Sequence, residues 1–209
     1  MADQPKRNGE TETIIWMNLN RDYWEERYAA NNLGWDIGTI STPLKDYIDQ
    51  LENKNLKILI PGAGNGYEAI YLHKNGFANV YVLDLARQPL EKIKAEIPEI
   101  ENNRLIQGDF FDLELQDFDL ILEQTFFCAL DPKLREDYVL KMNQLLSPGG
   151  KLAGLFFDFP LTHSGPPFGG SFEEYIGLFN PFFKIKVLER ANNSIAPRKG
   201  KELFFIFEK

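Results

Sequence analysis

Short apolar runs alternate with amphipathic segments over most of the chain, and this pattern predicts an α/β fold. Apolar runs of strand length lie near residues 57–60, 80–83, 104–107, 118–123 and 151–157. Helix-forming segments follow them near residues 67–75, 89–95, 131–146 and 172–179. Such alternation is typical of a parallel sheet covered by helices on both faces. Two more strands, near residues 183–189 and 202–207, indicate a terminal hairpin. We therefore expect a doubly wound, seven-stranded sheet that is mostly parallel with an antiparallel C-terminal strand.

The region before the first predicted strand is polar at its start and then helix-forming. Residues 1–18 are expected to form a flexible lead, and residues 20–50 an N-terminal helical lid. Trp24 and Tyr28 are four positions apart in the first helical segment, so they share one face. Thr42 is predicted to cap a second helix, with Pro43 at its first position. No repeat or linker interrupts the chain, so residues 1–209 predict a single domain.

Composition and charge narrow the function classes. A net charge of −8 argues against non-specific binding to nucleic acid or to an anionic membrane surface. No apolar run approaches the roughly 18 residues that a bilayer-spanning helix needs. The single cysteine, Cys128, excludes an internal disulfide, and with His73 and His163 it gives no metal-ligand spacing. We expect a cytoplasmic, metal-free monomer that acts on a small molecule.

The most informative motif is LKILIPGAGNGYE at residues 56–68, which reads as a buried strand, a glycine-rich turn and a helix. Gly62, Gly64 and Gly66 remove side chains from the turn, so a ligand can approach the backbone closely. The following helix offers unpaired N–H groups and its positive dipole end. Asp84 ends the next strand and suits a ribose, because a carboxylate accepts both hydroxyl hydrogens. These features indicate a nucleotide-cofactor site but leave open a dinucleotide or another nucleoside cofactor.

Two further loops follow the third and fourth predicted strands. Asp109 can accept a hydrogen bond from an adenine amino group, and Phe110 can pack on the adenine ring. Gln124, Phe126 and Phe127 follow the fourth strand. Because open sheets bind ligands at the carboxyl ends of parallel strands, we expect these loops to meet at one site.

The motifs PGAGNG, LD, GDFFD, FDLILEQTFFCAL and LSPGGKL together resemble those of class I S-adenosylmethionine-dependent methyltransferases. The segments YWEERY, GWDIG, TFFCAL, SGPPF and RKGKE are similar to the thiopurine S-methyltransferase family, most closely to its thiol, halide and thiocyanate methyltransferase branch. The resemblance spans roughly residues 22–206. It implies a Rossmann-like sheet, S-adenosyl-L-methionine as cofactor, and methyl transfer to a small sulfur nucleophile or soft anion.

The resemblance also implies roles for individual residues. It places an aromatic lid over the cofactor, the glycine loop at its methionine portion, and further contacts at its ribose, adenine and methionine parts. The cofactor-binding residues so implied are Trp24, Tyr28, Trp35, Gly62, Gly64, Asp84, Asp109, Phe110 and Gln124.

The acceptor side is predicted to be apolar with one cation. The candidates are Trp35, Phe126, Phe127 and Phe168, with Arg198 for an anionic acceptor. No catalytic residue is assigned, because a thiolate, hydrosulfide, thiocyanate or halide is nucleophilic without a general base.

Structural interpretations compete with these assignments. Trp24, Tyr28, Phe126 and Phe127 also fit ordinary core positions. Asp84 and Asp109 also fit helix caps or turns, and Gln124 and Arg198 also fit solvent-exposed positions in a loop and a turn. Cys128 also fits a small, buried apolar residue. Gln124 stands where the branch has a tyrosine, which leaves a thiopurine, a metalloid oxyanion or an aromatic thiol open as acceptor. The sequence is also compatible with a non-catalytic S-adenosylmethionine-binding protein and, less well, with a nicotinamide oxidoreductase.

Overall fold

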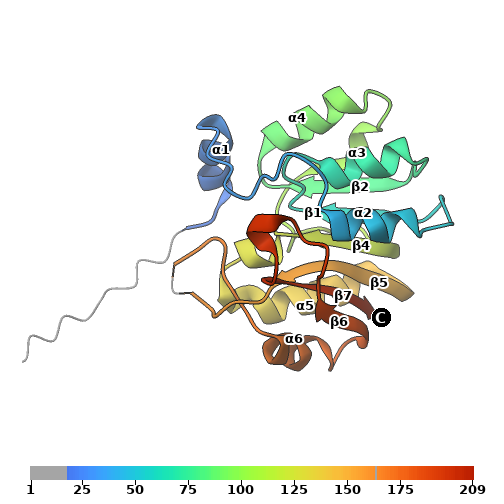
Figure 1. Ribbon diagram of the computed structural model, residues 1–209. Helices are drawn as coiled ribbons and strands as arrows, with labels where there is room; N and C mark the ends of the chain where they lie inside the picture. Colours follow the sequence, from blue (N-terminus) through green and yellow to red (C-terminus); the bar gives the residue numbers. More distant parts are fainter. Residues whose placement is uncertain (1–17, 163) are drawn as a thin grey trace, which may run out of the picture.

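The computed structural model describes residues 18–162 and 164–209 (Figure 1). Residues 1–17 of the predicted flexible lead, and His163, lie outside the described residues. A seven-stranded sheet runs in the order β3-β2-β1-β4-β5-β7-β6. The strands are β1 (Ile58–Pro61), β2 (Val80–Asp84), β3 (Leu105–Gln107), β4 (Phe118–Gln124), β5 (Leu146–Phe157), β6 (Lys184–Arg190) and β7 (Glu202–Glu208). Strands β1 to β5 pair in parallel, and β7 is antiparallel to both β5 and β6, which confirms the predicted fold class.

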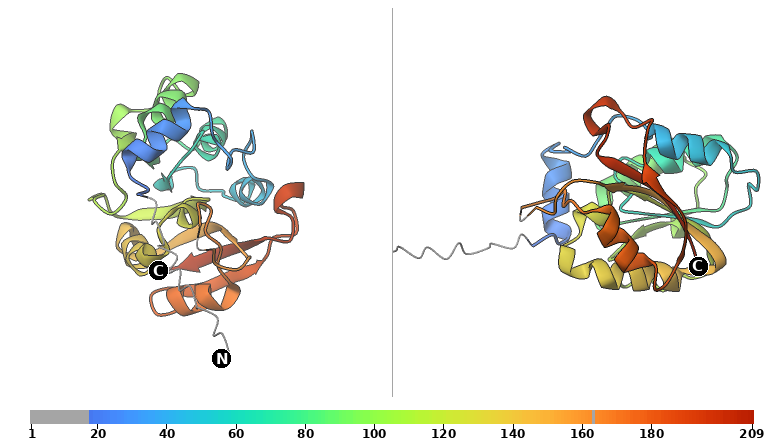
Figure 2. Two further views of the ribbon diagram at one scale, coloured as in Figure 1. Left: turned by 90° about the vertical axis from the view of Figure 1, so that its left-hand side faces the viewer. Right: turned by 60° about the horizontal axis from the view of Figure 1, so that its bottom comes forward.

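Helices cover both faces of this sheet. They are α1 (Arg21–Ala29), α2 (Thr42–Asp49), α3 (Tyr67–Lys74), α4 (Arg87–Glu96), α5 (Arg135–Leu145) and α6 (Phe172–Phe179). Helices α2, α3 and α4 lie on one face and α5 and α6 on the other, while α1 lies beyond the ends of the strands (Figures 1 and 2).

Successive residues of a strand pack into two separate hydrophobic cores, one on each face of the sheet, because both faces are buried. In β1, Ile58 and Ile60 pack with α2, α3 and α4, whereas Leu59 packs on the opposite side among residues of α5, α6 and β7. The second of these cores is rich in stacked aromatics, such as Phe156 against Phe205 at 4.0 Å between ring centroids. Much of the aromatic content of the chain therefore stabilises the fold.

Three predicted boundaries shift in the structure. Thr42 is the first residue of α2, and Ser41 occupies the cap position, so the prediction of Thr42 as cap is wrong by one residue. The segment predicted as one helix from residue 131 begins with a 3-10 turn, Pro132–Leu134, which the Asp131 side chain caps by accepting a hydrogen bond from the Lys133 N–H. The strand predicted from residue 151 already begins at Leu146, whose partner is Phe118.

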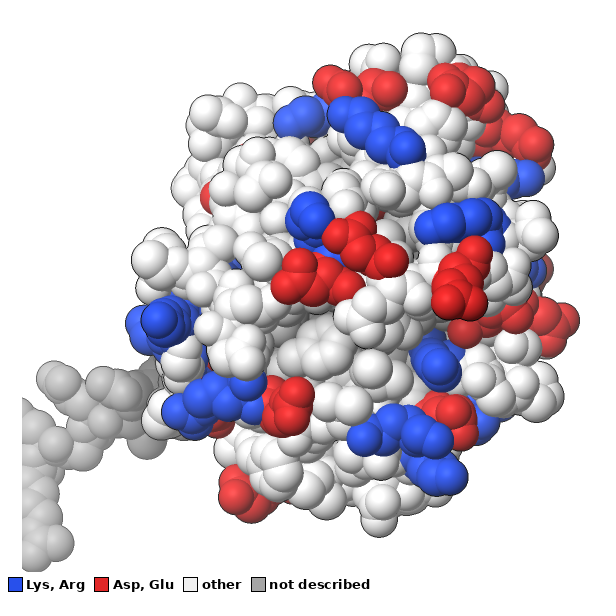
Figure 3. Space-filling model, turned by 45° about the vertical axis from the view of Figure 1, so that its right-hand side comes forward, with Lys and Arg blue, Asp and Glu red and all other residues white. Residues whose placement is uncertain are grey.

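No helix within the described residues is long and apolar enough to cross a membrane. On the face shown in Figure 3, acidic and basic side chains are intermixed over the surface. This face therefore presents no broad field of positive charge of the kind that nucleic-acid binding uses.

Candidate active site

A cavity of about 750 Å³ lies where the parallel strands end, beside α1. Its walls come from the glycine loop after β1, the end of β2, the loops after β3, β4 and β5, and the N-terminal lid. The residues predicted for the site that line it are Trp24, Tyr28, Trp35, Gly62, Gly64, Asp84, Asp109, Phe110, Phe126 and Arg198. The volume falls within the range of sites that enclose a drug-sized ligand.

The glycine loop adopts a backbone that side chains rarely permit. Gly62, Gly64 and Gly66 have φ angles of 60°, 54° and 73°, all in the left-handed region. The Gly62 N–H donates to the Leu83 carbonyl oxygen at 2.7 Å, which ties the loop to β2. The loop thus presents bare, fixed backbone to the cavity, as the sequence predicts.

Asp84 joins the glycine loop to the end of β2. Its carboxylate accepts hydrogen bonds from the Ala86 N–H at 2.9 Å and from the Gly64 N–H at 3.3 Å. Burial raises the pKa of Asp84 to about 6, although these two donors oppose the shift. Each carboxylate oxygen has about two acceptor positions, so both oxygens retain capacity for a ligand hydroxyl group.

The loop after β3 contributes one exposed carboxylate and one buried ring. Asp109 accepts a hydrogen bond from the Phe111 N–H at 2.9 Å, which fixes the turn. Phe110 lies 5.2 Å from Phe126 and 5.6 Å from Tyr138 between ring centroids, so its ring is held by the core while it lines the cavity.

The N-terminal lid packs as an aromatic cluster over the glycine loop. The Trp35 ring lies edge-on to Trp24 at 5.5 Å and to Tyr28 at 5.6 Å. Glu25 of α1 accepts a hydrogen bond from the Arg87 N–H at the start of α4, at 2.9 Å. The side chain of Asn65, in the glycine loop, donates to Asp36. Lid and cofactor loop are therefore connected by specific polar contacts as well as by packing.

Arg198 reaches the lid from the segment before β7. Its guanidinium donates to the Trp35 carbonyl oxygen at 2.8 Å and to the Glu202 carboxylate at 3.3 Å. Its side chain is only 12% exposed, and it borders the cavity. Arg198 therefore anchors the lid, and its binding of an anionic acceptor stays a prediction.

The loop after β4 is organised by a buried carboxylate that sequence reasoning missed. Glu123 is fully buried; it accepts hydrogen bonds from the N–H groups of Phe126 and Phe127 at 2.8 and 3.0 Å, and from the Tyr138 hydroxyl at 2.6 Å. Burial raises the pKa of Glu123 to about 7. Thr125, which lies between Glu123 and Phe126 in the chain, adopts a left-handed φ of 58°. This turn aims Phe126 at the cavity and Phe127 into the core.

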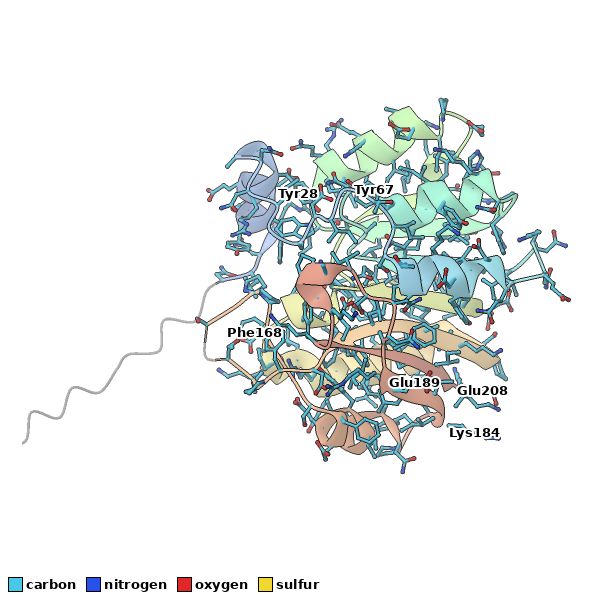
Figure 4. The ribbon with its side chains drawn as sticks, viewed as in Figure 1. Tyr28, Tyr67, Phe168, Lys184, Glu189 and Glu208 are labelled. Atoms are coloured by element: carbon cyan, nitrogen blue, oxygen red, sulfur yellow. The ribbon has the colours of Figure 1, made fainter. Side chains whose placement is uncertain are left out.

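Three predicted residues lie outside the main cavity. Phe127 is buried, and its ring centroid lies 4.9 Å from the ring centroids of Tyr138 and Phe156. Phe168 is buried in the loop after β5 (Figure 4), where its N–H donates to the Cys128 carbonyl oxygen at 2.7 Å. Pro166 and Pro167 line the cavity instead. Gln124 lines a smaller cavity. Cys128 borders the main cavity, but burial raises the pKa of its thiol, which therefore stays protonated.

The smaller cavity, of about 40 Å³, lies behind the glycine loop, and we call it the annex. It shares Trp35, Gly62, Gly64, Thr125 and Arg198 with the main cavity, and its own walls include Asp36, Asn65, Tyr67, Glu68 and Gln124. Gln124 accepts a hydrogen bond from the Ser41 hydroxyl at 2.8 Å, whereas its buried Nε2 has no partner. Burial raises the pKa of Glu68 to about 7.

Of the two residues that sequence reasoning missed, Glu123 left a sequence signal and Glu68 did not. Glu123 directly follows the apolar run LIL near the end of β4, and a carboxylate there has to be satisfied by donors once the strand is buried. Glu68 follows the glycine turn in the first turn of α3, a position that favours an acidic residue by itself, so its burial could not be inferred.

The site fits S-adenosylmethionine on its own geometry. The bare glycine loop can approach the methionine portion, Asp84 can accept from ribose hydroxyls, and Asp109 with Phe110 can hold an adenine. One observation then decides the family: the sequence profile of the thiopurine S-methyltransferase family matches residues 19–209. The chain belongs to the thiopurine S-methyltransferase family. It is an S-adenosylmethionine-dependent methyltransferase, as its motifs predict.

Similar proteins agree with this assignment. The chain is 30% identical to a probable thiol methyltransferase 2 of Arabidopsis thaliana, over 86% of this chain and 81% of the relative. It is 29% identical to thiocyanate methyltransferase 1 of Brassica oleracea, with the same two coverages. It is 25% identical to a thiopurine S-methyltransferase of Acinetobacter baylyi, over 87% of this chain and 94% of that one.

Solved structures share the fold of this family member. A Burkholderia thailandensis 1,6-didemethyltoxoflavin-N1-methyltransferase with bound S-adenosylhomocysteine superposes with a TM-score of 0.73 at 19% identity, over 90% of this chain and 86% of that one. A TehB-like methyltransferase of Corynebacterium glutamicum gives a TM-score of 0.63 at 21% identity, over 90% and 97%. At these identities the likeness concerns the fold alone.

Proposed function

We propose that this enzyme methylates a small sulfur nucleophile or soft anion, such as a thiol, hydrosulfide, thiocyanate or halide. The observation that carries this proposal is an apolar wall of the cavity. Phe126, Phe157, Phe159, Pro166 and Pro167 build that wall. Such a surface favours a polarisable, weakly hydrated acceptor over a strongly hydrated one. The names of the thiol and thiocyanate methyltransferase relatives support the same acceptor class.

When bound, S-adenosylmethionine supplies a methyl group on a sulfonium sulfur, which a nucleophile displaces in line. Asp84 binds the ribose, while Asp109 and Phe110 hold the adenine. The lid rings of Trp24, Tyr28 and Trp35 exclude water and restrict the acceptor to an aligned approach. An aromatic face near a cation contributes about 0.5–2 kcal/mol. No general base is required for an acceptor that is already nucleophilic.

A thiopurine is the second candidate acceptor. A cavity of about 750 Å³ leaves room for a ligand larger than a triatomic anion beside the cofactor. The Acinetobacter baylyi relative carries that substrate in its name. The two candidates are separated by their products.

We also propose that the enzyme acts as a cytoplasmic monomer. One chain by itself forms a cavity of about 750 Å³, and its single cysteine fits a reducing compartment. Light scattering with size-exclusion chromatography and cell fractionation test these two statements.

The acceptor proposal is tested by incubating the enzyme with methyl-labelled S-adenosylmethionine and one acceptor at a time. The panel contains hydrosulfide, thiocyanate, iodide, a small thiol and a thiopurine, with mass-spectrometric detection of labelled products. Product from the small acceptors is expected. Product from the thiopurine alone, or no product while S-adenosylhomocysteine still binds, would contradict the proposal.

A further inference from the structure

The annex contains a buried carboxyl group that accepts a hydrogen bond from its own backbone N–H and from no other described residue. Glu68 is only 6% exposed, yet within the described part of the chain its carboxyl group makes no hydrogen bond to another residue. A buried carboxylate in this condition carries a large desolvation cost. Its position on the wall of a cavity indicates that a ligand group completes it.

The other charged groups around the annex are already engaged. Asp36 accepts from the Gly38 N–H at 2.7 Å and from the Asn65 side chain. Arg198 is bound to the Trp35 carbonyl oxygen and to Glu202, and it acts on Glu68 only through its more distant charge. The annex therefore contains two carboxyl groups, of Asp36 and Glu68, and one guanidinium group, of Arg198, that is already hydrogen-bonded. This balance of charge favours a cation in the annex over an anionic acceptor.

The side chain of Gln124 indicates that the ligand carries a negative group as well as a positive one. The buried Nε2 of Gln124 is a donor without an acceptor. The Glu68 carboxyl group has acceptor positions left for a donor, the Gln124 amide lacks an acceptor, and both side chains line the same annex. An α-amino acid group supplies an ammonium donor and a carboxylate acceptor on adjacent carbons.

The annex adjoins the place where such a group would lie. It shares Gly62 and Gly64 with the main cavity. Its volume of about 40 Å³ suits the small polar end of a ligand rather than a whole acceptor molecule.

We propose that Glu68 binds the α-ammonium group of the cofactor in the annex and that the Gln124 amide donates to its α-carboxylate. The inference rests on the proposed function, since it concerns the same cofactor site. It makes Glu68 a determinant of affinity for the amino-acid end of the ligand.

Calorimetry with three adenosyl ligands tests each half of the inference separately. S-adenosylhomocysteine carries both groups, decarboxylated S-adenosylhomocysteine keeps the amine alone, and 5′-methylthioadenosine has neither. The variants are Glu68→Gln and Gln124→Leu, with Glu91→Gln as a control on the exposed surface of α4.

Glu68→Gln should weaken the two amine-bearing ligands about ten- to a hundredfold and leave 5′-methylthioadenosine unchanged. Gln124→Leu should weaken S-adenosylhomocysteine alone. Glu91→Gln should change nothing. Thermal unfolding serves as the folding check, because an uncharged amide at position 68 should not lower the melting temperature of the free protein.

Different failures have different meanings. Equal losses for all three ligands in Glu68→Gln, or no loss for any, would overturn the role of Glu68. A wild-type protein that binds S-adenosylhomocysteine no more tightly than 5′-methylthioadenosine would overturn the inference while leaving the cofactor site in place. Failure of the wild type to bind any of the three would overturn the proposed function as well.

Discussion

The ring of Phe126 lies against the backbone of Gly62, so that a methyl group on Gly62 would stand 2.9 Å from the ring Cγ. Real Cβ atoms do not approach another carbon that closely, so one of the two residues would have to move. The Phe126 ring also packs against the rings of Phe110 and Tyr138, which limits its movement. The cofactor loop and the acceptor wall therefore touch at this contact, and a change on one side displaces the other.

Gly62→Ala should be more damaging than the same change at Gly76. Both glycines have left-handed φ, which costs alanine about 1–2 kcal/mol, but Gly76 has open space around its Cα. The overlap with Phe126 should add about 1–3 kcal/mol at Gly62. Urea unfolding measures the stability, and calorimetry with S-adenosylhomocysteine should show weaker binding for Gly62→Ala alone. Equal behaviour of the two variants would refute the contact.

Glu123→Ala should disorder the loop that carries Phe126, whereas Glu123→Gln should preserve it. Alanine leaves two N–H groups and the Tyr138 hydroxyl buried without an acceptor, at about 1–3 kcal/mol each. Glutamine keeps one oxygen for the two N–H groups, and the hydroxyl can then accept from its amide. Thermal unfolding and S-adenosylhomocysteine affinity report the difference. A glutamine variant as defective as alanine would mean that the charge itself is needed.

Asp84→Asn should weaken S-adenosylhomocysteine about ten- to a hundredfold, because a charge-assisted bond to a ribose hydroxyl is lost. In the wild type, ligand hydroxyls favour the ionised form, so affinity should fall as the pH drops through about 6, the pKa of free Asp84. Glu68, with its pKa near 7, acts in the same direction, so part of the pH dependence should persist in the variant. Calorimetry against pH measures both effects, with Asp49→Asn on the surface of α2 as the control. A pH-independent affinity for the wild type would count against both carboxylates.

The ligand-free protein should show the opposite pH dependence in its stability. Glu68, Asp84 and Glu123 are buried with raised pKa values, so between about pH 4 and pH 7 the folded state binds more protons than the unfolded state. Their contribution is complete below their unfolded pKa values and is lost as the pH rises through about 6 to 7. Urea unfolding at about pH 5.5 and about pH 8 should give lower stability at the higher pH. Glu123→Gln should reduce this difference in stability by at most about 2 kcal/mol. An unchanged difference in that variant would show that Glu123 stays ionised.

Arg198→Lys should loosen the lid although it keeps the charge. Lysine cannot reproduce the two-pronged contact with the Trp35 carbonyl oxygen and Glu202. Limited trypsin digestion should cleave faster at Arg21 and Arg27, and Arg190→Lys is the matched control on an exposed ion pair. If cleavage is unchanged and only the KM for an anionic acceptor rises, Arg198 binds the acceptor instead of the lid.

The fold follows from the sequence because local pattern and tertiary burial agree. Apolar runs of β1 and β4 are short and separated by helices, so a parallel sheet buries them on both faces. The glycine loop and Asp84 were predictable for a related reason, since their chemistry is carried by residue type at a strand end.

Side-chain direction in the loops could not be predicted in the same way. Phe126 and Phe127 are adjacent and alike in sequence, and only the left-handed turn at Thr125, held by Glu123, sends one to the cavity and the other to the core. Arg198 reads as a solvated turn residue until β7 brings it beneath Trp35. These outcomes depend on contacts between residues far apart in the chain, which no local pattern contains.

The central claim is that a small, soft acceptor receives the methyl group in this site. The most direct measurement is a competition in which thiocyanate, hydrosulfide and a thiopurine are present together with labelled S-adenosylmethionine, and the labelled products are counted by mass spectrometry. The account predicts that methylated small acceptors dominate and that Asp84→Ala reduces all of them together. Predominance of the methylated thiopurine, or absence of every product while S-adenosylhomocysteine binds normally, would contradict it.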